Sequence, residues 1–164
     1  MDAITAFLNS ELDHEIYMWP PPGLEEDPNR VCLLNKILYS MKQSAKLWAD
    51  DASKVLYLLN FVRSQYDNLL FFRREDRVYV ITHVDDFKII GFICKAIDQV
   101  KAQLISKFLI KDLGSVDFYL SIKVDRDRAK RIIWLTQTTT MDRIIKELEI
   151  KDYKIVKILI ESGL

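Results

Sequence analysis

Apolar residues recur along the chain with two different periods. From Gln43 to Asn60 they are spaced three or four residues apart, which predicts an amphipathic helix, and the same spacing predicts a second helix over 94–107. Shorter apolar runs at 69–72, 78–83 and 87–91 predict strands. The first two runs flank a short polar stretch, so we expect them to form a hairpin.

The remaining patterns lie towards the C-terminus. Residues 109–111 predict a short strand, and the runs at 116–124 and 131–136 predict a second hairpin around a charged turn. A third helix is expected over 141–148. Thr138–Thr140 are candidates for its N-cap, because their hydroxyls can accept bonds from the first free backbone N–H groups of a helix.

The order of these elements indicates the fold class. A strand, a long helix, two strands, a helix and a strand follow one another, which is the βαββαβ order of an α+β, ferredoxin-like fold with an antiparallel sheet and helices on one face. A β-hairpin and a C-terminal helix follow. We therefore expect three segments, 1–115, 116–137 and 138–164, and residues 151–164 show no clear pattern.

The composition is that of a folded domain of ordinary size. Of the 164 residues, 49% are hydrophobic, which excludes a disordered chain, and no apolar run approaches the length of a membrane span. Cys32 and Cys94 lie in apolar surroundings, so we expect both to be reduced core residues of an intracellular protein.

Charge is distributed unevenly along the chain. Residues 1–29 hold seven acids and no lysine or arginine, against 24 bases and 17 acids in the rest. Scattered surface charge is the simplest explanation, and a cation site beside a polyanion-binding surface is the alternative.

The most unusual local feature is the acidic pair Asp85-Asp86 between two apolar strands. A plain turn is one interpretation, because aspartate is common in turns. The other is a metal site, because an acidic tip between two rigid strands fixes negative charge at one point. In the βαββαβ layout the first strand runs antiparallel to the third, which places Asp2 beside Asp85. Grouped carboxylates repel one another unless a divalent ion neutralises them, and their oxygens favour Mg²⁺ or Mn²⁺.

Several ordered blocks of sequence carry a family resemblance. Each block is weak alone, but in this order and spacing they are together similar to the reverse transcriptase domain of copia-type retrotransposons, from Asp2 to about Val156. The blocks are Asp2–Ser10, Glu15–Met18, Pro21–Leu24, Leu34–Ser44, Leu47–Trp48, His83–Asp86, Lys111–Gly114 and Tyr119–Ile122.

The resemblance implies the palm of an RNA-directed DNA polymerase, a nucleotidyltransferase of a transposable element. It assigns the catalytic acids to Asp2, Asp85 and Asp86. Asp2, Asp85 and the backbone carbonyl of Ala3 would hold Mg²⁺, or Mn²⁺ in its place, and Asp86 would have a weaker or outer role. The implied partners are an RNA template, a DNA primer and deoxynucleotides, with no membrane. The implied location is the cytoplasm, within virus-like particles in the parent family.

The resemblance also implies four substrate-binding residues. Phe7 matches the aromatic side chain that excludes the ribose 2′-hydroxyl, although an ordinary core aromatic is the alternative. Gln43 matches a residue near the incoming nucleotide and template. Lys111 matches a lysine near the pyrophosphate, for which a plain surface lysine is the alternative. His83 stands near the primer end, where the family usually has tyrosine. It would share a strand face with Asp85, so a role as metal ligand is also considered.

The resemblance also assigns a role to each of the three expected segments. Residues 1–115 correspond to a truncated palm. Residues 116–137 correspond to a hairpin that grips the primer terminus, matched at Tyr119–Ile122. Residues 138–164 correspond to a connection or thumb-like segment.

Departures from the family pattern lead to an alternative hypothesis. Ser10, Ser40 and Ser121 stand where the family has glycines, and no fingers region precedes Asp2 in the sequence. We therefore expect a short first strand that leaves part of the edge of residues 86–91 unpaired, marginal stability, and no primer extension by this chain alone. A non-catalytic remnant of a decayed element is thus the alternative to a polymerase palm, and an unrelated ferredoxin-like binding domain is a weaker third.

Overall fold

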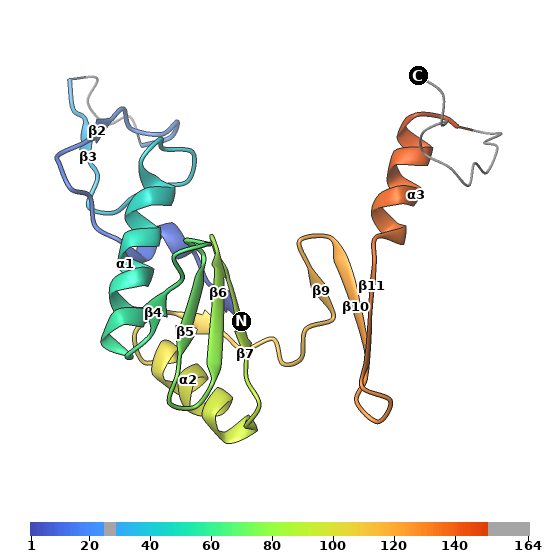
Figure 1. Cartoon of the computed structure of the whole chain (residues 1–164). Helices are drawn as coiled ribbons and strands as arrows, with labels where there is room; N and C mark the ends of the chain where they lie inside the picture. Colours follow the sequence, from blue (N-terminus) through green and yellow to red (C-terminus); the bar gives the residue numbers. More distant parts are fainter. Residues whose placement is uncertain (25–28, 151–164) are drawn as a thin grey trace, which may run out of the picture. The chain divides into compact units, whose positions relative to one another are not determined.

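The computed structural model describes residues 1–24 and 29–150, and the chain divides into two compact units (Figure 1). The first unit spans Met1–Gly114, and the second begins at Ser115. Within the described residues, no helix is long and apolar enough to cross a bilayer.

The first unit is built on a six-stranded sheet with the order β4-β5-β6-β7-β1-β8, in which every neighbouring pair is antiparallel. The expected hairpin is present as β5 and β6, and the third apolar run is β7, so these predictions are confirmed. The first strand is as short as expected, because β1 has two residues. The strands are β1 (Asp2–Ala3), β4 (Val62–Arg63), β5 (Leu70–Arg73), β6 (Val78–His83), β7 (Asp86–Ile90) and β8 (Ile110–Lys111).

Both predicted helices of this unit are present, as α1 (Ser44–Leu58) and α2 (Cys94–Ile105). Helix α1 is followed by Asn60 at φ 64°, a left-handed conformation that asparagine tolerates better than most residues. The side chains that the two helices bury join those of the sheet in one hydrophobic core. The sheet contributes every second residue of β6 and neighbouring residues of β7, such as Val80 and Phe87. Residues two apart on a strand point to the same face, so both helices cover one face of the sheet.

A short 3₁₀ helix (Ala6–Asn9) follows β1, and a separate antiparallel ribbon pairs β2 (Tyr17–Met18) with β3 (Cys32–Leu33). The prediction that both cysteines lie in the core is wrong, because both are exposed. Cys32 lies on the solvated ribbon, and Cys94 is the first residue of α2, outside the stripe of that helix that faces the sheet.

The second unit contains a three-stranded antiparallel sheet, β9 (Phe118–Tyr119), β10 (Ile122–Asp127) and β11 (Ile132–Thr136), followed by α3 (Thr138–Glu147). The predicted two-stranded hairpin is corrected in two ways. Leu120 and Ser121, both at positive φ, reverse the chain and divide the first arm, and β10 continues through charged residues that were assigned to the turn.

Helix α3 begins three residues earlier than predicted. Thr138–Thr140, expected to cap it, lie inside it, and Gln137 precedes it without a side-chain capping bond. No side chain in residues 115–150 is buried. The rest of the expected thumb-like segment, 151–164, lies outside the described residues.

Candidate functional site

Four residues of the predicted site lie in one row across four neighbouring strands. The register pairs Asp2 of β1 with Asp86 of β7 on one side and with Lys111 of β8 on the other, and Asp86 pairs with His83 of β6. Directly opposed residues of antiparallel strands project from the same side, so these side chains share one face. That face is opposite to the one covered by the helices, because Asp86 is followed by buried Phe87. The predicted adjacency of the first strand and the 84–87 hairpin is confirmed.

Asp85 lies in the two-residue turn between β6 and β7, beside Val84, and therefore not on the strand face of His83 as the sequence analysis expected. The Ala3 N–H donates to the Asp85 carbonyl at 2.7 Å, which ties β1 to the turn. From the other side, the Trp48 indole Nε1–H donates to the Val84 carbonyl at 2.7 Å. Val84 has φ 49°, a strained conformation for a β-branched residue. The turn is thus held by a strand and by a helix.

Burial raises the pKa of the Asp85 carboxyl, and the negative charges of Asp2 and Asp86 raise it further. A hydrogen bond from Tyr39 acts in the opposite direction and lowers this pKa. The Oδ1 atom of Asp85 is buried and has no hydrogen-bond partner. Three carboxylates therefore lie close together, and one of them has a buried oxygen without a partner. A bound divalent cation would neutralise these negative charges and give that oxygen a ligand bond.

The described residues offer a divalent ion only a few protein ligands. Within residues 1–24 and 29–150, no group of three or more histidine, cysteine or acidic side chains is arranged to hold a metal ion. The residues present therefore suit a site with few protein ligands, Asp2 and Asp85 with the Ala3 carbonyl. Mg²⁺ is commonly bound in this way, with one or two carboxylates and with water or substrate phosphates as the other ligands.

Phe7 approaches this site through an aromatic neighbour. It is buried, and its ring centroid lies 4.6 Å from that of Tyr39. Burial raises the pKa of the Tyr39 hydroxyl, and the charges of Asp85 and Asp2 and a hydrogen bond with the Asp85 side chain raise it further. Tyr39 was missed as a site residue, although it lies in a block that carried the resemblance. Phe7 also belongs to the hydrophobic core, as the alternative interpretation expected, and its role in excluding the ribose 2′-hydroxyl stays a prediction.

Gln43 is the predicted site residue with the fewest contacts that connect it to the carboxylates. It is half-buried immediately before α1, where its carbonyl accepts the N–H of Leu47 at 3.0 Å. No contact of the Gln43 side chain with the acidic residues is recorded in the part of the chain that the structure describes. Five residues later, Trp48 does reach the Val84–Asp85 turn, and this contact was missed because the helical pattern indicated only a core residue.

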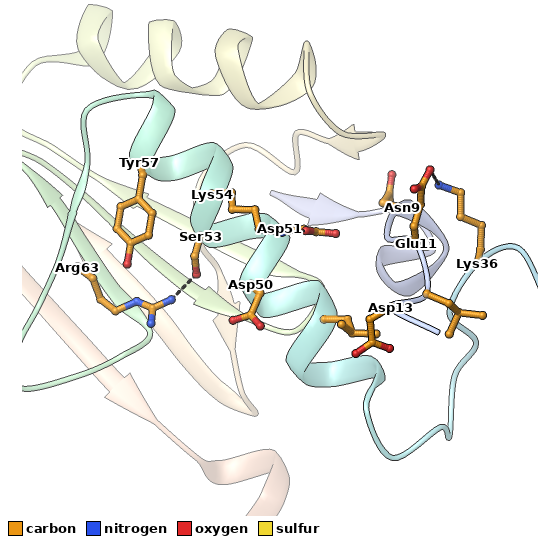
Figure 2. Close-up of a pocket in the computed structure, with 12 residues that line it drawn as sticks. Asn9, Glu11, Asp13, Lys36, Asp50, Asp51, Ser53, Lys54, Tyr57 and Arg63 are labelled. Atoms are coloured by element: carbon orange, nitrogen blue, oxygen red, sulfur yellow. Dashed lines mark hydrogen bonds and ion pairs between the residues drawn. The ribbon is translucent and has the colours of Figure 1, made fainter. Parts of the chain in front are cut away.

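A cavity of about 700 Å³ lies on another side of the first unit, against α1 (Figure 2). None of the predicted site residues lines it. Both of its lysines are paired with acids that also line it, Lys54 with Asp51 at 2.8 Å and Lys36 with Glu11 at 3.6 Å, and Arg63 donates to the Ser53 hydroxyl. The carboxylate row, and not this cavity, is therefore the stronger candidate site.

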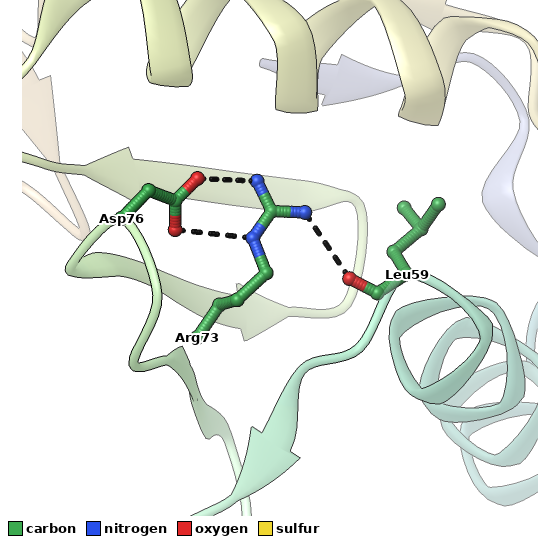
Figure 3. A network of polar contacts seen from close by, with 3 residues as sticks. All are labelled: Leu59, Arg73 and Asp76. Carbon is green, nitrogen blue, oxygen red and sulfur yellow. Dashed lines mark hydrogen bonds and ion pairs between the residues drawn. The ribbon is translucent and has the colours of Figure 1, made fainter.

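A second polar cluster away from the carboxylates is structural (Figure 3). The Arg73 guanidinium donates to both carboxylate oxygens of Asp76, at 2.6 and 3.1 Å, and to the Leu59 carbonyl at 3.1 Å. It also lies over the Phe61 ring, 4.8 Å from the centroid. This cluster joins the end of α1 to the β5–β6 hairpin.

Comparisons with known proteins identify the family of the chain. A family described as "Reverse transcriptase (RNA-dependent DNA polymerase)" matches residues 1–162. The chain is 32% identical over 159 residues to the Retrovirus-related Pol polyprotein from transposon TNT 1-94 of Nicotiana tabacum, covering 94% of this chain and 12% of that protein. It is 32% identical over 161 residues to the transposon Ty5-1 protein YCL074W of Saccharomyces cerevisiae, covering 96% of this chain and 52% of the relative.

A third relative, the Retrovirus-related Pol polyprotein from transposon RE1 of Arabidopsis thaliana, is 33% identical over 130 residues, which cover 77% of this chain and 9% of that protein. No solved structure matches significantly. The chain thus spans about half the length, or much less, of the relatives it matches. The chain belongs to the reverse transcriptase (RNA-dependent DNA polymerase) family, in the group found in the Pol polyproteins of copia-type retrotransposons.

Proposed function

We propose that the first unit is the ferredoxin-like palm of this polymerase family. The order of strands in space supports the proposal. The elements β1, α1, β6, β7, α2 and β8 follow one another in sequence, and the strands among them lie in the order β6-β7-β1-β8. This order agrees with the split βαβ arrangement expected from the sequence, and two further strands, β4 and β5, lie beside β6.

The proposed reaction is nucleotidyl transfer, in which a primer 3′-hydroxyl attacks the α-phosphate of a deoxynucleotide and pyrophosphate leaves. Asp2, Asp85 and the Ala3 carbonyl would hold Mg²⁺, with Asp86 in an outer role. When bound, two such ions stabilise the attacking and leaving oxygens of a phosphoryl transfer. The observation that carries this proposal is the pairing of Asp2 with Asp86, which sets the Asp2 carboxylate near that of Asp85, whose Oδ1 atom is buried and without a partner.

The substrate roles follow from the same row of residues. Lys111 flanks Asp2 and is exposed, which suits a contact with the pyrophosphate. His83 flanks Asp86 on the other side, which suits the primer end. Phe7, packed on Tyr39, would exclude the ribose 2′-hydroxyl, and Gln43 would lie near the nucleotide and template. We further propose an RNA template and a DNA primer as partners.

The same family membership supports proposals for the other segments. Residues 116–137 would act as the primer-grip hairpin and 138–164 as a connection or thumb-like segment. The protein would work in the cytoplasm, in virus-like particles.

A second candidate function is a non-catalytic remnant that at most binds nucleic acid. The observation that favours it is the backbone of Ser40 and Ser121, at φ 69° and 66°. Both positions carry glycine in the family, and a side chain in this conformation costs about 1 kcal/mol. The strain would fall on the segment before α1 and on the β9–β10 turn, next to residues assigned to the nucleotide and the primer.

Extension of a DNA primer on an RNA template, with deoxynucleotides and Mg²⁺ or Mn²⁺, separates the two candidates. A catalytic palm extends the primer, and Asp85→Asn abolishes the extension. A chain that binds Mn²⁺ and template-primer but extends nothing supports the remnant. Extension that survives Asp85→Asn contradicts the proposed site.

A further inference from the structure

Trp48 of α1 is buried in the core, with 2% of its surface exposed. Its ring packs edge-on against Phe87 and Phe108, at centroid distances of 6.2 and 5.0 Å. This packing explains the aromatic ring but not the position of its one polar atom. The indole Nε1–H donates to the carbonyl of Val84, 36 residues along the chain, at 2.7 Å.

The acceptor of this bond is unusual because it lies in the turn that presents Asp85. A two-residue hairpin turn whose first residue has positive φ normally carries glycine there, and this chain has Val84 at φ 49°. A strained backbone persists only where its surroundings hold it. On the side of β1, the Ala3 N–H binds the Asp85 carbonyl, so the indole supplies the matching restraint from the helix side.

We propose that Trp48 is a positioning residue, which holds the Val84–Asp85 turn through the Val84 carbonyl so that the Asp85 carboxylate stays beside Asp2 for a divalent cation. This inference rests on the proposed metal site. Trp48 touches neither ion nor substrate. It acts as the outer partner that orients a ligand, and the loss of such a partner typically weakens metal binding by about 10- to 100-fold.

The test is a Mn²⁺ titration of the whole chain, in which free Mn²⁺ is measured by electron paramagnetic resonance. Trp48→Phe keeps an aromatic ring and removes the N–H. Phe108→Leu is the matched control, because it disturbs the same aromatic cluster but leaves the indole bond to Val84 in place. Replacement of Trp48 by β-(3-benzothienyl)alanine, which keeps the ring size and lacks only the donor, serves if Trp48→Phe does not fold. Hydrogen exchange of the Ala3 amide reports the turn geometry without metal.

We expect loss of the indole donor to weaken Mn²⁺ binding by about tenfold and to reduce protection of the Ala3 amide, with Phe108→Leu unchanged in both. Unchanged Mn²⁺ affinity without the donor, while Asp85→Asn abolishes binding, overturns the role of Trp48 and leaves the metal site intact. An equal loss in Phe108→Leu also overturns it, because general core damage would then explain the effect. Mn²⁺ binding that survives Asp85→Asn refutes the proposed metal site, and the role of Trp48 with it.

Discussion

The carboxyl group of Asp85 is unfavourably placed in the absence of a cation. Its buried oxygen has no partner, and burial and the charges of Asp2 and Asp86 all raise its pKa. A raised pKa in the folded state means that the folded protein binds this proton more tightly than the unfolded chain does. The contribution to stability is therefore most favourable below the pKa of an unfolded aspartate. It is lost as the pH rises through the raised value.

We accordingly expect Asp85→Asn to stabilise the metal-free protein at neutral pH. The gain should shrink as the pH falls through the raised pKa of Asp85, because the wild-type carboxyl is then protonated and neutral. Urea unfolding in the presence of a chelator, repeated across this pH range, measures the difference. A variant less stable than wild type at neutral pH would show that the ionised carboxylate is well compensated, contrary to the account given for this site.

Backbone strain at Ser40 leads to a second prediction at this scale. With φ 69°, this residue occupies a conformation that glycine adopts without cost. Ser40→Gly should therefore stabilise the protein by about 1 kcal/mol in denaturant unfolding. Ser106→Gly is the control, because Ser106 has φ −70°, where glycine only adds flexibility to the unfolded chain and should destabilise. Equal effects of the two substitutions would contradict the interpretation.

Among the elements, an ion pair within the β5–β6 hairpin supports the contact of the hairpin with the end of α1. Asp76 has a lowered pKa, chiefly because the Arg73 guanidinium donates hydrogen bonds to it. The pair is largely shielded from solvent, with side-chain exposures of 11% for Arg73 and 23% for Asp76. Since Arg73 also binds the Leu59 carbonyl, loss of Asp76 should loosen the junction between helix and hairpin.

Asp76→Asn should cost about 1–2 kcal/mol of unfolding free energy at neutral pH. A lowered pKa in the folded state gives stability that is present above the ordinary pKa of aspartate and is lost as the pH falls through the lowered value. The difference between variant and wild type should therefore diminish below about pH 4. Urea unfolding at neutral and acidic pH measures both parts, and a difference that stays constant with pH would exclude the ion pair as its source.

At the scale of the whole molecule, local patterns predicted the elements and the topology that joins Asp2 to the 84–87 hairpin. The sequence did not predict the contacts of Tyr39 and Trp48 with this hairpin, because long-range contacts leave no periodic trace. The Leu120–Ser121 turn escaped prediction because both residues lie within the largely apolar run 116–124, which predicted one uninterrupted strand. The burial of both cysteines was inferred from their apolar neighbours in the sequence, which are a weaker guide than position within an element.

The buried hydrophobic residues lie between Ala3 and Ile110, and none lies in residues 115–150. We therefore expect a chain ending at Gly114 to unfold cooperatively and to bind Mn²⁺ as the full chain does. Residues 115–164 alone should show no cooperative transition. Circular dichroism during urea unfolding distinguishes these outcomes. Loss of the cooperative transition on removal of 115–164 would show that the second unit completes the core of the first.

The central claim is that Asp2 and Asp85 share a divalent cation. Mn²⁺ titration of wild type, Asp2→Asn, Asp85→Asn and Asp98→Asn tests it most directly, since Asp98 is an exposed acid of α2 in the same unit. Each of the first two substitutions removes a direct ligand, so each should weaken binding by more than about tenfold, and Asp98→Asn should bind as wild type does. Wild-type Mn²⁺ affinity in either Asp2→Asn or Asp85→Asn would contradict the shared site.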